Sequence, residues 1–220
     1  MTVARKLAAE ALGTGLLVAA VVGSGIMADR LTDDTALALL ANSITTGGAL
    51  LVLIACLGPL SGAHFNPVVT LAFALRREIA PRIALGYVLT QALGGILGTL
   101  LAHAMFDLPI LQVSTALRGG TGQWIAEAVA SAGLILALLG ALRAGANVAL
   151  IVAAYILAAY WFTASTSFAN PAVALARSMT DSFAGISPAS LTGFWGAELA
   201  GGLLGLALAH WLFAKEKPPA

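Results

Sequence analysis

The sequence GAHFNPVVT, residues 62–70, places an Asn-Pro pair inside a chain whose residues are 60% hydrophobic. A second stretch, SFANPAVA at residues 167–174, repeats the pair in the other half of the chain. Asparagine and proline are poor helix formers, and a lipid bilayer offers no water to satisfy the backbone groups of a broken helix. The repetition therefore indicates that both halves of the chain use the same structural feature.

The composition indicates an integral membrane protein. Only 10% of the 220 residues are charged and the mean hydropathy is +0.95, whereas soluble domains carry roughly 25% charged residues. The formal net charge of +1 gives no indication of nucleic-acid binding. No catalytic constellation is visible, so we do not expect an enzyme. The scattered histidines and the single cysteine, Cys56, predict no metal site, and we expect no cofactor.

Membrane-spanning helices need about 20 apolar residues each. Such segments lie near residues 4–27, 37–58, 81–105, 123–142, 147–164 and 191–213, which predicts six spans. A cleaved signal peptide is the alternative for the first segment, because Arg5 and Lys6 precede its apolar run. That run continues to Met27, however, and is long enough to span the bilayer.

The basic residues predict the orientation of the spans, because cytoplasmic loops carry an excess of lysine and arginine. Those expected on the side shared by both termini are Arg5, Lys6, Arg76, Arg77, Arg82, Arg143, Lys215 and Lys217; those expected on the other side are Arg30, Arg118 and Arg177. The excess on the first side predicts a protein of the cell membrane with both termini in the cytoplasm.

The two halves of the chain share three patterns in the same order. The sequence AEALG at residues 9–13 returns as AEAVA at 126–130, and NPV at 66–68 returns as NPA at 170–172. YVLTQALGG at 87–95 has a looser counterpart in FWGAELAGG at 194–202. Each half carries three spans, so the second must be inverted relative to the first. The sequence therefore predicts one membrane channel domain, residues 1–220, with inverted repeats at approximately 1–105 and 120–213, an architecture known for transport proteins.

Each Asn-Pro pair reads as the start of a half-helix, because asparagine is favoured as an N-cap and proline in the first turn. The first half-helix begins after Asn66 and ends before Arg76; the second begins after Asn170 and ends near Met179. About ten residues rise about 15 Å, which is half of a 30 Å hydrocarbon core. Two inverted half-helices would therefore meet near the midplane, N-terminus to N-terminus.

This meeting point predicts a pore. Two helix N-termini carry partial positive charge, which repels cations and protons, and the two Asn side chains offer NH₂ donors to a neutral solute. The loops before them must be extended, so that their carbonyls line one wall. The loop residues expected to contribute this backbone are Gly62, Ala63, His64, Phe168 and Ala169.

The chain resembles the aquaporin family, the major intrinsic proteins, over essentially its whole length. The resemblance rests on the sequence SGAHFNP at residues 61–67, on the Ala-Glu pairs of the first and fourth spans, and on the paired motifs Asn66, Pro67, Val68 and Asn170, Pro171, Ala172. It implies an all-α membrane protein with six transmembrane helices and two re-entrant half-helices, forming a homotetramer in the lipid bilayer. Each subunit is then expected to pass water or small neutral solutes passively. Val68 departs from the alanine usual in this family.

Pores of this family are narrowed by four positions outside the Asn-Pro centre. Counted from the two motifs, the resemblance assigns these positions to Thr46, Ala158, Ser167 and Val173. Water-selective members place an aromatic residue, a histidine and an arginine here, and glycerol-conducting members keep the arginine. None of these residue types occurs at the four positions, so we expect a wide, uncharged selectivity filter.

Such a filter is similar to that of bacterial aquaglyceroporin-like channels associated with arsenic resistance. The resemblance implies polyols, urea and undissociated arsenous acid as solutes, with or without water. A water-selective channel is one alternative. A proton-coupled carrier that uses Glu10, Glu127 or Glu198 as relays is another, and a junctional or structural membrane protein is a third. For Cys56, packing is the simpler interpretation, and a pore-facing thiol that binds soft metals is the alternative.

Several polar residues accompany the predicted pore. Glu10 and Glu127 lie inside spans, where a charge costs at least ~2.5–3.5 kcal/mol, and their matching positions favour bracing of the two loops. Gln91 and Glu198 are expected to assist them. Arg177 lies one helical turn, about 5.4 Å, beyond Val173, where it would add positive charge at the mouth. The alternative is that Arg177 points to lipid headgroups or pairs with Asp181.

Overall fold

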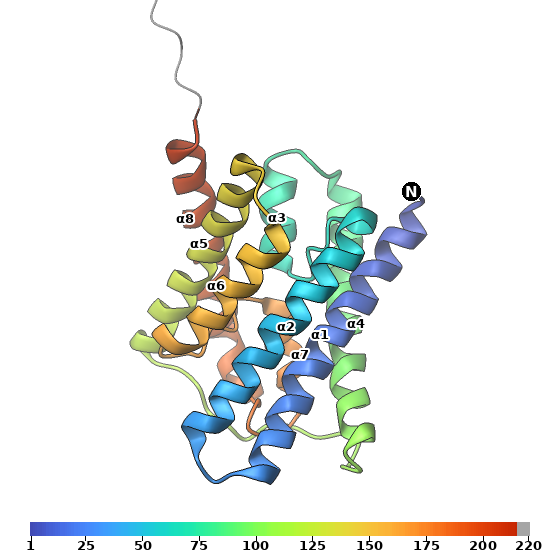
Figure 1. Cartoon of the computed structure of the whole chain (residues 1–220), viewed down its shortest axis with the longest axis vertical. Coiled ribbons are helices and arrows are strands. Elements are labelled where there is room, and N and C mark those ends of the chain that lie inside the picture. The colour runs from blue at the N-terminus through green and yellow to red at the C-terminus, as the bar shows by residue number, and fades with distance from the viewer. Residues whose placement is uncertain (215–220) are drawn as a thin grey trace, which may run out of the picture.

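Residues 1–214 are described in the computed structural model, and this part of the chain is helical, without β-strands. Figure 1 shows a bundle of long helices that encloses two short ones. The helices are α1 (Val3–Leu31), α2 (Thr35–Ser61), α3 (Pro67–Leu75), α4 (Pro81–Met105), α5 (Thr121–Ala144), α6 (Val148–Phe162), α7 (Pro171–Arg177) and α8 (Leu191–Leu212), with a 3-10 turn η1 (Pro188–Ser190) before α8.

The predicted fold class is confirmed. The six predicted spans correspond to α1, α2, α4, α5, α6 and α8, and the predicted half-helices correspond to α3 and α7. Five spans are long and apolar enough to cross a membrane, whereas α6 is a shorter apolar helix of 15 residues, which rises about 22 Å. Helix α7 ends at Arg177, slightly before the predicted end near Met179.

The two halves of the bundle pack in the same way. Helix α1 packs along α4, α5 packs along α8, and α2 meets α6 between the halves. Glycines permit the first two crossings: Gly94 lies on Ala11, Gly98 on Gly15, Gly201 on Ala128 and Gly205 on Ala132. A Cβ at any of these glycines would overlap a backbone carbonyl oxygen, so small residues set how closely the helices approach.

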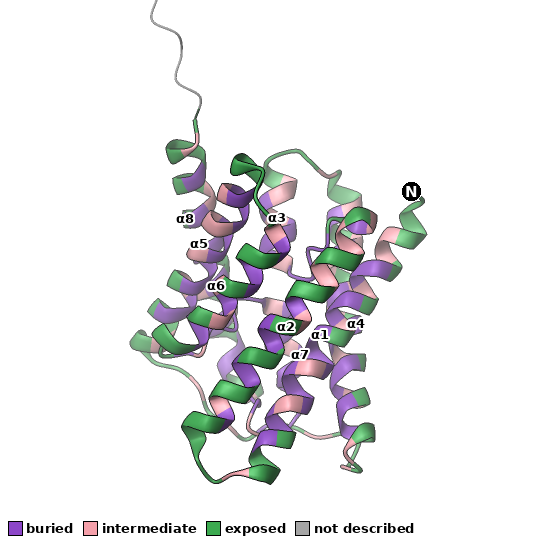
Figure 2. Cartoon of the chain, in the orientation of Figure 1, coloured by how far each residue is buried: buried purple, intermediate pink, exposed green. Residues whose placement is uncertain are grey.

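The N-terminus and the last turns of α8 lie at the same end of the bundle, at the top of Figure 1. Arg76, Arg143 and His210 line a surface pocket at this end. Lys215 and Lys217, which were predicted for this side, lie outside the described residues. Figure 2 shows exposed residues on the outer faces of the helices and buried residues between them. Many of the exposed residues are leucines, as a lipid-facing surface requires.

Candidate functional site

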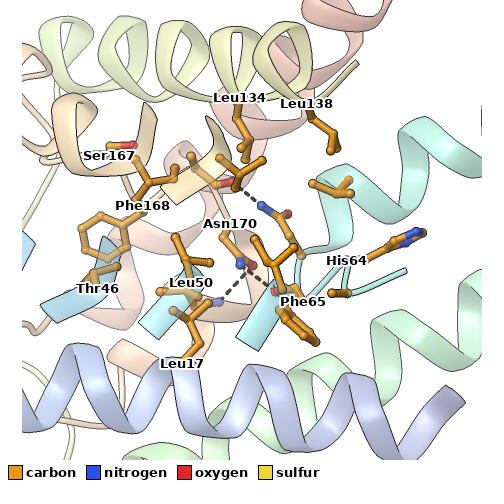
Figure 3. A pocket seen from close by; sticks show the side chains of 18 of the residues that line it. Leu17, Thr46, Leu50, His64, Phe65, Leu134, Leu138, Ser167, Phe168 and Asn170 are labelled. Carbon is orange, nitrogen blue, oxygen red and sulfur yellow. Dashed lines mark hydrogen bonds between the residues drawn. The ribbon is translucent and has the colours of Figure 1, made fainter. Parts of the chain in front are cut away.

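The two Asn-Pro pairs meet inside the bundle. Asn66 and Asn170 are the N-caps of α3 and α7, and the side-chain oxygen of each accepts hydrogen bonds from the start of its own helix. The Asn66 Nδ2 donates to the carbonyl of Ala169 at 2.7 Å. The Asn170 Nδ2 donates to the carbonyl of Phe65 at 2.8 Å, between the two residues labelled in Figure 3. An amide nitrogen carries two hydrogens. The second hydrogen of each asparagine is therefore available to a molecule in the cavity that both residues line.

The residues after each asparagine fit their helical positions. Pro67 and Pro171 are the first residues of α3 and α7. The N–H of a first helical residue has no partner within the helix, so a proline, which lacks this N–H, fits there without loss. Val68 is buried, and its Cγ1 occupies the space that a Cβ at Gly202 of α8 would need. The side chain of Val68 therefore packs against α8. Ala172 is also buried, and its N–H donates to the Asn170 side chain.

The loops before the two half-helices share an unusual backbone conformation. Ala63 and Phe65 both have φ of 48°, and the matching residues Ser167 and Ala169 have φ of 52° and 47°. Residues other than glycine avoid this left-handed region, at a cost of roughly 1–2 kcal/mol each. Strain of this kind persists only where surrounding structure enforces it, and it concentrates at functional sites.

Buried side chains from the long helices hold the first loop. Glu10 of α1 accepts hydrogen bonds from the backbone N–H of His64 at 3.0 Å and of Phe65 at 2.7 Å. It also accepts from the Ser61 hydroxyl at 2.6 Å and from the Gln91 amide of α4 at 2.8 Å. Both oxygens of the carboxylate are thus fully engaged, which offsets the cost of burying it.

The second loop is held from the corresponding helices. Glu127 of α5 accepts from the N–H of Phe168 at 2.9 Å and of Ala169 at 2.7 Å. Glu198 of α8 accepts from the next N–H, that of Asn170, at 3.1 Å. Both carboxyl groups are completely buried and bind loop backbone. They lie behind the loop, outside the set of residues that line the cavity.

These hydrogen bonds also fix the direction of the loop carbonyls. In a planar trans peptide, the carbonyl of one residue points away from the N–H of the next. Because the N–H groups of His64 and Phe65 turn towards Glu10, the preceding carbonyls face the other way, and the second loop repeats this arrangement. The loop residues that line the cavity are Gly62, Ala63, His64 and Phe65, with Ser167, Phe168 and Ala169 opposite them in the repeat.

The cavity beside the two asparagines has a volume of about 80 Å³ (Figure 3). A water molecule needs ~10–15 Å³ of such space, so the cavity holds a short file of waters or one small solute. The loops and asparagines form one wall, and apolar side chains form most of the rest: Leu17, Val21, Leu50, Ile54, Leu134, Leu138, Val148, Val152 and Ile156. The arrangement suits an uncharged molecule that makes hydrogen bonds on one side only.

Comparison with known proteins identifies the family. Residues 1–145 match the family described as Major intrinsic protein. The chain belongs to this family. Aquaglyceroporin AqpS from Rhizobium meliloti (strain 1021) is 58% identical over 215 residues, which cover 97% of this chain and 92% of that protein. Aquaporin NIP1-2 from Arabidopsis thaliana is 38% identical over 104 residues, or 47% of this chain and 35% of that protein.

A solved structure supports the fold. The X-ray structure of the aquaglyceroporin from Plasmodium falciparum superposes with a TM-score of 0.73 over 96% of each chain, at 20% sequence identity. Members of the major intrinsic protein family are channels and not enzymes. The chain is therefore an integral membrane channel for small neutral solutes or water.

Three of the four predicted filter residues of this major intrinsic protein line one end of the cavity. Thr46, Ser167 and Val173 lie there with Tyr160, and we call these four residues the outer end. The fourth predicted residue, Ala158, is exposed on α6 and does not line the cavity, which corrects the prediction. Tyr160 takes its place, and its hydroxyl lies 3.1 Å from the Thr46 Oγ1. Residues two apart on a helix do not share a face, so Ala158 and Tyr160 cannot both point inward.

A signal for Tyr160 was present in the sequence. Val148, Val152, Ile156 and Tyr160 follow one another at intervals of four residues, which places them on one helical face, and all four line the cavity. The prediction of Ala158 counted residues back from Asn170, which assumes that the number of residues between the filter position of the span and the loop is the same in all relatives. Helical periodicity within α6 would have identified Tyr160.

Arg177 also lines the cavity, next to the outer end. The side chain is buried, its guanidinium stacks on the Phe168 ring with 3.5 Å to the ring centroid, and its Nε donates to the carbonyl of Ala184. Asp181 binds elsewhere: it accepts from the N–H and hydroxyl of Thr115, both at 2.9 Å, and these bonds lower the pKa of its carboxyl. The structure thus places Arg177 away from both lipid and Asp181.

The structure also shows the surroundings of His64 and Cys56, two residues considered in the sequence analysis. The His64 ring stacks on Phe73, with 4.6 Å between ring centroids, and its Nδ1 lies 3.1 Å from the Thr70 hydroxyl. His64 therefore braces the start of α3 in addition to lining the cavity. Cys56 is exposed on α2 and is not among the cavity-lining residues, which disfavours the pore-facing thiol.

Proposed function

We propose that this channel conducts small uncharged solutes passively, glycerol and arsenous acid among them, with or without water. The observation that carries the proposal is the outer end, where Val173 stands at the position that relatives give to a pore-facing arginine. Val173, Thr46 and Ser167 are small, so on their side they leave space for solutes larger than water, whereas Tyr160 is the one bulky residue of the outer end. That relatives include an aquaglyceroporin of 58% identity adds support.

The selectivity for neutral solutes follows from the walls of the cavity. Solute hydroxyls accept from the free amide hydrogens of Asn66 and Asn170 and donate to the loop carbonyls. The facing wall is apolar and gives an ion no replacement for its hydration shell. The N-termini of α3 and α7 add partial positive charge where the two asparagines meet. Arsenous acid is uncharged at neutral pH and avoids both barriers.

Arg177 contributes a positive charge just beyond the filter in this proposal. Its stacking on Phe168 and its hydrogen bond to Ala184 hold the guanidinium against one side of the cavity. The charge discourages cations while Val173 leaves the filter itself open. The sequence predicts an uncharged filter. The four outer-end residues are uncharged, but Arg177 places a charge one helical turn beyond Val173.

The contacts of the buried glutamates argue against a proton-coupled carrier. Glu10, Glu127 and Glu198 all accept hydrogen bonds from loop backbone, and none of them lines the cavity. A relay residue must exchange protons with the solute path. Bracing of the loops is therefore the better-supported role for these three residues.

A water-selective channel is the second candidate, and one observation favours it. The hydroxyls of Tyr160 and Thr46 lie 3.1 Å apart, so these side chains meet at the outer end and reduce its width. If this contact persists during conduction, glycerol would pass much more slowly than water. The ratio of the two permeabilities separates the candidates.

The proposal also covers location and assembly. We place the two inverted repeats, residues 1–105 and 120–213, as one channel domain in the cell membrane with both termini in the cytoplasm. The end of the bundle where the N-terminus and the last turns of α8 lie also carries Arg76 and Arg143, in keeping with the positive-inside rule. Family membership supports a homotetramer with one pore per subunit.

Stopped-flow light scattering on proteoliposomes tests the function. Vesicles containing the protein are challenged with gradients of sucrose, glycerol or arsenous acid, and empty vesicles are the control. We expect faster entry of glycerol and arsenous acid than in empty vesicles. Fast water flow with no added glycerol or arsenous acid entry would favour the water-selective candidate instead. No added flux of any kind would support a structural role.

A further inference from the structure

Three consecutive backbone amides before α7 are divided between two carboxyl groups. The N–H groups of Phe168 and Ala169 donate to Glu127, and that of Asn170 donates to the Glu198 Oε1. Because the three amides are consecutive along the chain, the two carboxyl groups that accept from them lie close together behind the loop. Both side chains have no solvent exposure.

In the first repeat, the residue beside the loop-binding glutamate is an amide and not a second acid. There Glu10 takes the loop amides, and the residue on the paired helix is Gln91, whose Nε2 donates to the Glu10 Oε2 at 2.8 Å and to Thr70 at 2.9 Å. An amide supplies hydrogens to a neighbouring carboxylate. In the second repeat the corresponding residue on α8 is Glu198, which supplies a hydrogen only if it is protonated.

The Glu198 Oε2 is buried and has no hydrogen-bond partner among residues 1–214. An ionised carboxylate left in this state would be both unpaired and next to a second negative charge, and both effects are costly. We propose that Glu198 carries a proton on Oε2 and shares it with Glu127, so that the pair holds one negative charge and positions Asn170.

The cations near the pair do not supply this hydrogen bond. Arg177, on α7, donates to the Ala184 carbonyl and stacks on Phe168, and Arg118, in the loop before α5, donates to the carbonyls of Gly185 and Phe183. Both arginines therefore act on the pair only through their charge. Glu198 is a positioning residue: it acts on a solute through Asn170, and only this part of the proposal rests on the proposed function.

Infrared spectroscopy tests the proton directly, in a detergent without ester groups and independently of any solute. A protonated carboxyl group has its own C=O stretching band, which shifts when the protein is labelled with ¹³C-glutamate. We expect the parent to show this band at neutral pH and Glu198→Gln to lose it. The reciprocal variant Gln91→Glu recreates the acid pair in the first repeat and should gain a second band.

Glycerol flux in proteoliposomes tests the positioning role. Glu198→Gln should retain flux within about twofold of the parent, because an amide donates where the acid did; Glu198→Leu, which has no polar group, should lose most of it. Absence of the band in the parent, or its persistence in Glu198→Gln, would overturn the shared proton. A band that disappears together with flux in Glu198→Gln would overturn the positioning role. A parent that conducts no solute contradicts the proposed function, and the infrared result still decides the proton.

Discussion

The centre of the cavity, around Asn66 and Asn170, follows the symmetry of the two repeats, whereas the outer end does not. At the centre, Asn66 and Asn170 make matching bonds to the carbonyls of Ala169 and Phe65, at 2.7 and 2.8 Å. At the outer end no such symmetry exists, because Thr46 lies 20 residues before Asn66 whereas Tyr160 lies ten residues before Asn170, and Arg177 has no counterpart charge in α3. The centre is thus built equally from both repeats, whereas the outer end takes Thr46 from the first repeat and its other three residues from the second.

This difference separates two properties of the channel. The centre contains the groups that any neutral hydroxylated solute can use, so we attribute conduction itself to it. In the proposed function the outer end selects which solutes reach the centre, since Val173 and Tyr160 would set its width and Arg177 would supply a charge beside it. Substitutions at the centre should therefore affect all solutes alike, and substitutions at the outer end should discriminate among them.

The largest effect is expected at the centre. Asn66→Asp and Asn170→Asp each replace an NH₂ donor by a carboxylate that faces the carbonyl it formerly bound. A lost buried hydrogen bond to a charged group costs ~1–3 kcal/mol or more, and 1.4 kcal/mol corresponds to a factor of about ten. Flux of water, glycerol and arsenous acid should fall about tenfold or more in stopped-flow assays.

Membrane insertion is the control for these variants, measured by size-exclusion chromatography and helical circular dichroism. Asn66→Asp and Asn170→Asp should also affect flux to a similar degree, because the two bonds match. Normal conduction by both correctly inserted variants would refute the account of the centre. An effect confined to one variant would refute its symmetry.

The next effect is expected at Val173. Val173→Arg places a long cationic side chain in the filter and should lower glycerol and arsenous acid flux by about tenfold, with a smaller loss for water, because pore diameter limits the larger solutes first. Val173→Leu adds bulk without charge and serves as the matched control. Equal losses for water and glycerol in Val173→Arg would show that the filter does not discriminate by width.

The sequence was sufficient for the centre and insufficient for the outer end, for a physical reason. Asn66, Asn170, Glu10 and Glu127 belong to repeated patterns, so each half supports the interpretation of the other. The outer end depends on how far α6 extends and how it is rotated, which no repeat reveals. For this reason Ala158 was wrongly predicted to line the filter. The stacking of Arg177 on Phe168 could not be predicted from the spacing of residues along the chain.

The sequence predicts loop carbonyls along the pore wall, but it does not reveal the conformation that turns the loop amides away from the cavity. The sequence indicated that the loops must be extended, yet the structure adds alternate residues in the left-handed region, such as Ala63 and Ser167. Nothing in the local sequence demands this conformation, because glycine would adopt it more readily. It follows from long-range bonds to Glu10 and Glu127, which connect residues far apart in the chain.

A smaller and selective effect is expected at Arg177. Arg177→Ala should leave glycerol flux nearly unchanged and increase proton or cation leak by about tenfold or less, since one charge near water contributes ~1 kcal/mol at 4 Å. Arg177→Lys keeps the charge and is the control. Leak is measured with a pH-sensitive dye inside the vesicles. An Arg177→Ala channel as proton-tight as the parent would remove Arg177 from the account of charge exclusion.

The smallest effect is expected at Tyr160. Tyr160→Phe removes the hydroxyl that lies 3.1 Å from Thr46 and should raise the glycerol-to-water permeability ratio by about two- to threefold, because one neutral hydrogen bond contributes ~0.5–1.5 kcal/mol. Ala158→Ser is the matched control on the exposed face of α6 and should change nothing. An effect of Ala158→Ser equal to that of Tyr160→Phe would contradict the assignment of the cavity-lining face.

The central claim is that neutral solutes pass through this cavity passively. Its most direct test is the initial rate of glycerol entry into proteoliposomes at concentrations rising into the millimolar range, with and without a proton ionophore. We predict a rate that rises linearly with concentration and is unchanged by the ionophore. A rate that saturates at low concentration and collapses when the ionophore is added would contradict the claim and favour a proton-coupled carrier.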